Sequence, residues 1–114
     1  MALQITEKQM GGTTVLTLAG RVVLGDESNQ LRQKIKTLVA AGKKRLVLDL
    51  GEVTYIDSAG LGTLVSGFTS SQSQGASMKL ANLTKKFHEQ LNITKLATVF
   101  DVYDSVDAAL ASFA

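Results

Sequence analysis

The fold is decided by residues 46–68, which read LVLDLGEVTYIDSAGLGTLVSGF. The first five of these residues are almost continuously apolar, which is typical of a strand whose two faces are both covered. Further along, apolar residues recur at offsets of zero, three, four and seven, so they share one helical face. These positions are Leu61, Leu64, Val65 and Phe68. The stretch therefore predicts a buried strand, a turn and a helix packed against the strand.

The residues before this stretch predict an antiparallel hairpin. Two apolar-rich segments, 2–8 and 13–18, are separated by the glycine pair 11–12, and the second segment alternates with a period of two. Gly20 then allows a bend, and the short apolar piece 22–24 is interpreted as a further strand.

A first helix is predicted between Gly25 and Gly42. Residues 26–28 (Asp-Glu-Ser) supply hydrogen-bond acceptors and negative charge at its start. Its apolar residues follow at helical offsets, and they are Leu31, Ile35, Leu38 and Val39.

Strands and helices alternate from residue 46 to the end. Residues 78–81 and 99–102 predict two short strands; Thr84 is expected to cap one helix, and Ser105 or Asp104 the last. Because strand–helix–strand crossovers are right-handed, these strands are expected to be parallel. The predicted fold class is α/β: a single domain, residues 1–114, with a mixed β-sheet, an N-terminal antiparallel hairpin, and parallel strands flanked by about four helices.

The reactive groups of the chain are few. Its 114 residues include no Cys, and His88 is the only His, so we expect no thiol chemistry, no metal site and no cofactor. A net charge of +2 is too balanced to indicate a nucleic-acid partner. No apolar run approaches the roughly 18 residues of a membrane span, and residues 1–10 lack the apolar core of a signal peptide. We expect a cytoplasmic protein without direct membrane insertion.

Residues 57–62, DSAGLG, depart from the usual composition of a helix start. Glycine in a helix costs about 1 kcal/mol relative to alanine, so Gly60 and Gly62 require another reason. Either the helix packs closely on the sheet, or a partner or ligand approaches closely. Ligands of open α/β sheets collect at the carboxyl ends of strands, where this turn is predicted to lie. Asp57 and Ser58 are both ordinary capping residues; Asp57 can cap alone, which leaves the Ser58 hydroxyl free for another use.

Ser58 does not fit an enzyme nucleophile. The nucleophile elbow Gly-x-Ser-x-Gly needs a glycine where Ile56 stands, and no acidic residue lies between Ser58 and His88 to complete a triad. The sequence contains no Gly-Lys-Ser/Thr, and Val65 stands where a dinucleotide fingerprint needs its third glycine. We therefore expect that the protein is not an enzyme.

The helix after Ser58 has an uncharged outer face. From residue 58 to 87 the only charged residues are Lys79, Lys85 and Lys86. The predicted exposed face offers small hydroxyls from Ser66, Thr69, Ser70 and Ser73. A partner can cover such a face without burying unpaired ions, but an ordinary Ser/Thr-rich surface has the same composition.

Segments 46–50 and 53–62 together resemble the signature of STAS domains, in particular the bacterial anti-sigma factor antagonists, and the similarity extends over nearly the whole chain. The resemblance implies that Ser58 accepts phosphate from a serine kinase that is itself the anti-sigma factor. The unphosphorylated protein would bind this kinase and free the sigma factor; the phosphorylated protein would release it, and a cognate phosphatase would reset the switch. The expected partner-binding residues are Asp57, Ser58, Ala59, Gly60, Leu61, Gly62 and Ser66.

Two alternatives remain open at this point. A STAS domain can also serve as a structural or regulatory subunit, either in a stress-signalling assembly or beside an ABC transporter that moves lipids. STAS folds have further been linked to small-molecule ligands. In the antagonists an acidic residue often follows the second strand in a Gly-x-Leu-Asp arrangement, whereas here the first acid after Gly20 is Asp26. We expect this difference to affect which partner is recognised.

Overall fold

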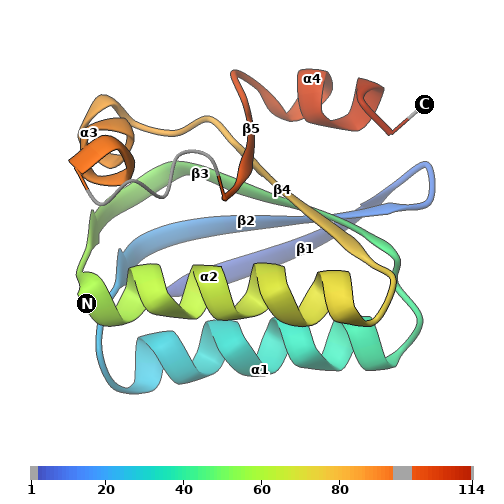
Figure 1. Cartoon of the computed structure of the whole chain (residues 1–114), viewed down its shortest axis with the longest axis horizontal. Helices are drawn as coiled ribbons and strands as arrows, with labels where there is room; N and C mark the ends of the chain where they lie inside the picture. Colours follow the sequence, from blue (N-terminus) through green and yellow to red (C-terminus); the bar gives the residue numbers. More distant parts are fainter. Residues whose placement is uncertain (1–2, 94–98, 114) are drawn as a thin grey trace.

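A computed structural model describes residues 3–93 and 99–113, which form one mixed sheet with helices on both of its faces (Figure 1). In chain order the elements are β1 (Gln4–Met10), β2 (Thr13–Val22), α1 (Asp26–Ala40), β3 (Arg45–Ile56), α2 (Ser58–Ser73), β4 (Ser77–Ala81), α3 (Lys85–Ile93), β5 (Asp101–Tyr103) and α4 (Val106–Ala111). The strand order is β1-β2-β3-β4-β5. Only the β1–β2 pair is antiparallel within the described residues. The predicted α/β class and mixed sheet are confirmed.

The N-terminal hairpin is present, but its second strand is longer than predicted. Gly11 and Gly12 make the turn with φ values of 58° and 83°, a region that favours glycine. The separate strand predicted at 22–24 is wrong, because β2 continues to Val22. The bend is absorbed inside β2, where the register with β3 shifts and Gly20 has a φ of 112°.

The first helix, α1, has the predicted apolar face and a different start. Leu31, Ile35, Leu38 and Val39 are all buried. No side chain caps α1, because its N-cap position is Gly25. Ser28, expected to supply an acceptor at this end, is buried, and its hydroxyl donates to the carbonyl of Val23 at 2.6 Å. Asp26 and Glu27 place negative charge in the first turn of α1, as predicted. Ser28 does not cap the helix but holds the preceding loop.

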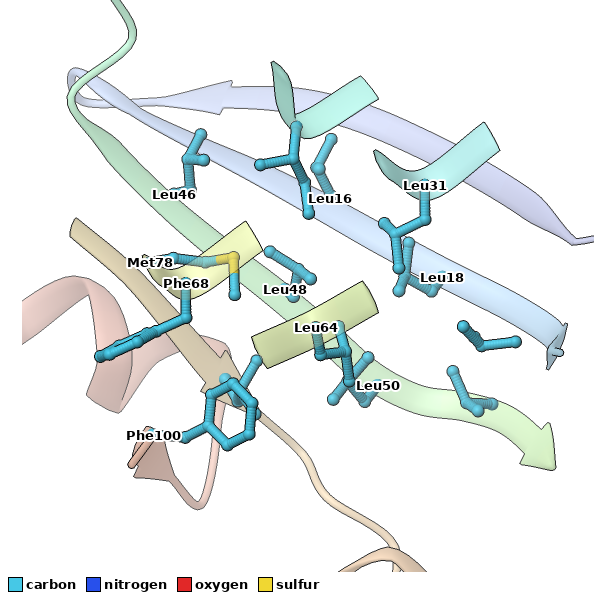
Figure 2. Packing of buried hydrophobic residues seen from close by; sticks show 14 of the residues in the cluster. Leu16, Leu18, Leu31, Leu46, Leu48, Leu50, Leu64, Phe68, Met78 and Phe100 are labelled. Carbon is cyan, nitrogen blue, oxygen red and sulfur yellow. The ribbon is translucent and has the colours of Figure 1, made fainter. Parts of the chain in front are cut away.

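The main core lies between the sheet and the helix pair α1 and α2. Figure 2 shows leucines of β2 and β3 pointing toward these helices, and Leu16, Leu48 and Leu64 are fully buried there. A Cβ at Gly67 of α2 would lie 2.9 Å from the Cδ1 of Ile35, so this glycine lets the two helices approach closely. On the other face α4 covers a smaller cluster of Val15, Val47, Ala81 and Ala109.

The caps predicted for the last two helices are present, whereas several strand boundaries differ from the prediction. The Thr84 hydroxyl accepts the N–H of Phe87, and Ser105, rather than Asp104, accepts the N–H of Ala108. β5 begins at residue 101 rather than 99. β3 extends six residues beyond the predicted 46–50, because Val53 and Ile56 also face the core. This extension carries the chain directly to Asp57.

Candidate functional site

The predicted turn lies at the carboxyl ends of β2 and β3. Asp57 is the single residue between β3 and α2. Figure 1 shows that the starts of α1 and α2 and the whole of α3 lie at this end of the sheet. Ligands and partners of open α/β sheets collect at such an end, so its exposed side chains form the candidate site.

Asp57 joins three parts of this rim. Its Oδ1 accepts the N–H of Gly60 at 2.8 Å, and its Oδ2 accepts the N–H of Leu24 at 3.0 Å. Its own backbone N–H donates to the carbonyl of Val22 at 3.3 Å. The hydrogen bonds from Gly60 and then Leu24 hold the pKa of the Asp57 carboxyl below its ordinary value. Asp57 thus caps α2 alone and ties the loop before α1 to the start of α2.

The two glycines of the first turn of α2 have different reasons to be glycine. A Cβ at Gly60 would lie 2.0 Å from the carbonyl oxygen of Val22 and 2.9 Å from Cγ1 of Ile56. Gly60 is therefore explained by packing of helix on sheet. At Gly62, which is exposed, a Cβ would meet nothing within 4 Å outside its own turn of helix. Packing of the fold therefore gives no reason for glycine at position 62.

Ser58 begins α2 with an exposed side chain. Within the described part of the chain its hydroxyl makes no hydrogen bond, because Asp57 takes the capping role. Gly62 and Ser66 follow at intervals of four residues and are also exposed, so the three positions line one face of the helix.

The other expected partner-binding residues lie behind this face. Gly60 and Leu61 are buried, and Ala59 and Asp57 are half-buried. Leu61 belongs to the main core. In this structure Gly60 and Leu61 position the exposed face and are not accessible to a partner, because the sheet covers them.

Two exposed apolar side chains at the same rim were not predicted as site residues. Leu24 has 76% of its surface exposed, in the loop that Asp57 holds, and Tyr55, near the end of β3, has 43% exposed. Leu24 was not named as a site residue because the apolar run 22–24 was interpreted as a strand, although the resemblance had marked the segment after Gly20 as one that affects partner choice.

No arrangement for metal or membrane chemistry is present among the described residues. They contain no group of three or more His, Asp or Glu side chains close enough to hold a metal ion, and His88 is exposed on α3. None of the helices in residues 3–93 and 99–113 is both long and apolar enough to cross a membrane.

Comparison with known proteins gives concordant matches. The family model described as STAS domain matches residues 4–109. The anti-sigma-B factor antagonist of Bacillus subtilis is 31% identical over 102 residues, which cover 90% of this chain and 92% of that protein. An anti-sigma factor antagonist from Mycobacterium paratuberculosis has the same fold, with a TM-score of 0.84, 21% identity, and coverage of 97% of this chain and 93% of that one.

A second similar structure is that of the Bacillus cell fate determinant SpoIIAA in its phosphorylated form. Its TM-score is 0.74 at 16% identity, and the match covers 97% of this chain and 100% of that one. At this identity the likeness extends to the fold alone.

Proposed function

Because this chain belongs to the STAS domain family, among the anti-sigma factor antagonists, we propose that it binds an anti-sigma factor that is a serine kinase and releases it when Ser58 is phosphorylated. Binding sequesters the kinase and frees the sigma factor in the bacterial cytoplasm, and a cognate phosphatase resets the switch. The observation that carries this proposal is the Ser58 hydroxyl, which is exposed at the start of α2 and not used as a cap. The chain is then a substrate and binding partner, and the kinase supplies the catalysis.

The fold can accept a phosphate at Ser58 without unfolding. A phosphoserine adds about −1.5 to −2 charges at pH 7. At the amino end of α2 this charge interacts favourably with the helix dipole. The phosphate would lie beside the Asp57 carboxylate. The helix α2 itself, Ser58–Ser73, contains no acidic residue, so the phosphate would change the charge of its exposed face. A partner that fits the neutral face would be repelled, so the switch acts on binding rather than on folding.

The proposed interface is the exposed face of α2 together with the adjoining loop. Ser58, Gly62 and Ser66 supply a strip without charge or bulk, and the missing side chain at Gly62 allows a partner backbone to approach the Ser58 hydroxyl. Leu24 supplies an exposed apolar side chain for the partner to bury. Asp57 fixes Leu24 relative to Ser58, because its carboxylate binds both the loop and the helix.

Capture of partners from the bacterial source tests this proposal. Immobilised wild-type chain and Ser58→Ala are expected to retain an anti-sigma factor, whereas Ser58→Asp is expected to lose it. Gln33→Glu is the matched control, because it adds one negative charge on the side of α1 near β1. When ATP is added to the captured complexes, the kinase should transfer one phosphate to the wild-type chain and none to Ser58→Ala, as read by intact mass. Equal phosphorylation of both chains, or stable association with transporter subunits regardless of Ser58, would contradict the proposal.

A further inference from the structure

A group of cationic side chains gathers on Tyr55, beside the proposed interface. The guanidinium carbon of Arg21, near the end of β2, lies 5.6 Å from the centroid of the Tyr55 ring. The Nζ of Lys86, in the first turn of α3, also lies 5.6 Å from that centroid. All three side chains are exposed. We call these three residues the cationic cluster.

The charges of this cluster are not neutralised within the described residues. In residues 3–93 and 99–113 the one ion pair joins Lys34 to Glu7, outside the cluster. Asp57, two residues after Tyr55, already accepts backbone N–H groups on both carboxylate oxygens. An aromatic ring attracts a cation but does not cancel its charge. Two positive charges therefore remain available on an exposed ring.

The helix dipole does not favour the position of Lys86. A cation in the first turn of a helix opposes the helix dipole, and Lys86 is the second residue of α3. Its neighbour Lys85 adds another positive charge to this turn. Glu89, one turn later, forms no ion pair with Lys86 in the structure. The Tyr55 ring offsets part of this cost for Lys86, and a negative charge from outside the chain would offset more.

The cluster is continuous with the Ser58 surface. Arg21 pairs with Tyr55 across β2 and β3, and the next residue, Val22, accepts the backbone N–H of Asp57. Tyr55 is the second-last residue of β3, and Ser58, three residues later, begins α2. A protein large enough to cover Ser58 and Leu24 can therefore reach the cluster as well.

We propose that the cationic cluster binds an acidic segment of the partner protein, with an Asp or Glu carboxylate placed against Arg21. This inference rests on the proposed function and adds the chemistry of the partner surface. A guanidinium binds a carboxylate with two parallel hydrogen bonds, and the Tyr55 ring holds the guanidinium of Arg21 and the ammonium of Lys86 each within 5.6 Å of its centroid before binding. Tyr and Arg are also the residues that most often dominate the energy of protein interfaces.

Cross-linking in the bacterial source identifies what lies on the cluster. One chain carries p-benzoylphenylalanine in place of Tyr55, which keeps an aromatic ring there, and a matched chain carries it in place of Leu24. After irradiation, position 55 should be joined to a partner segment with net negative charge. A neutral or basic segment, a nucleic acid or a lipid at position 55 would overturn the proposal, as would cross-linking from position 24 alone. Without a protein adduct from either position, the proposed function fails as well.

The salt dependence of binding gives a second, quantitative test. The anti-sigma factor identified by cross-linking at position 24 is purified, and its affinity for the unlinked chains is measured. The double variant Arg21→Ala/Lys86→Ala should bind it about tenfold more weakly than wild type at about 50 mM salt, and only about twofold more weakly at about 500 mM. Lys8→Ala/Lys43→Ala removes the same charge near the opposite ends of β2 and β3 and should bind like wild type. Equal affinity of both double variants at low salt would contradict an acidic contact at the cluster, although Ser58-dependent binding would still stand.

Discussion

Substitution of the two glycines at the start of α2 by alanine should change stability in opposite directions. In Gly60→Ala the new Cβ would lie 2.0 Å from the Val22 carbonyl oxygen and 2.8 Å from its carbon. Alanine has no rotamer that avoids this contact, so α2 and β2 must separate by about 1 Å or more, as in other overpacked cores. In Gly62→Ala the new Cβ has no neighbour within 4 Å outside its own turn.

The expected magnitudes follow from these distances. Overpacking costs about 1–3 kcal/mol, and the separation also stretches the Asp57–Val22 hydrogen bond, so we expect Gly60→Ala to lose about 2 kcal/mol or more despite the better helix propensity of alanine. Gly62→Ala should gain about 0.5–1 kcal/mol, since only the propensity changes. Both changes are measurable against a total on the order of 5–15 kcal/mol.

Urea unfolding followed by circular dichroism measures both changes. The midpoint should fall for Gly60→Ala and rise for Gly62→Ala, with unchanged slopes. A stable Gly60→Ala would refute the packing reason for Gly60, and a destabilised Gly62→Ala would refute the statement that the fold leaves that position open. If Gly62 serves partner approach, the more stable Gly62→Ala should nevertheless bind the anti-sigma factor more weakly in calorimetry.

Three further predictions concern the core, the cap and the exposed loop. Leu64→Ala should lower the free energy of unfolding by about 2–5 kcal/mol in the same urea assay, because Leu64 is fully buried; a loss below about 1 kcal/mol would contradict that packing. The Asp57 carboxylate has a lowered pKa in the folded state, so it contributes stability that is present above the unfolded pKa and is lost as pH falls through the folded pKa. Asp57→Ala should therefore lose less stability than wild type on acidification below about pH 4, and parallel pH profiles would exclude this role. Leu24→Ser should leave the urea midpoint unchanged and weaken partner binding roughly tenfold, because burial of a leucine side chain is worth about 1.5 kcal/mol or more; equal affinity in calorimetry would remove Leu24 from the interface.

Much of the fold could be predicted because periodicity is a local property. The apolar positions of α1 and α2 were found from spacing alone, and most of them are buried. Asp57 could be named, with Ser58, as a candidate cap of α2, because its acceptor and the N–H of Gly60 are three residues apart. Ser28 was misjudged for the complementary reason: its side chain hydrogen-bonds back to the carbonyl of Val23 instead of to a free N–H of α1.

The site could be predicted only in part because its remaining features depend on contacts between distant residues. Gly60 and Gly62 are equivalent in sequence, and the contacts of the folded chain distinguish them, the tightest being with the Val22 carbonyl, 38 residues earlier. Leu24 resembles the end of a strand in the sequence, whereas in the structure its backbone N–H donates to the carboxylate of Asp57, 33 residues away. Arg21, Tyr55 and Lys86 come from three separate elements, so no sequence window contains the cationic cluster.

The most direct test of the proposed switch uses phosphoserine itself. The chain is prepared with phosphoserine incorporated at position 58, and its affinity for the anti-sigma factor is compared by calorimetry with that of the unmodified chain. The phosphorylated chain should remain folded, with a melting temperature within a few degrees of the unmodified one, and should bind more than about tenfold more weakly. Equal affinity of the two forms, or a phosphorylated chain that unfolds, would contradict a switch that acts at the interface.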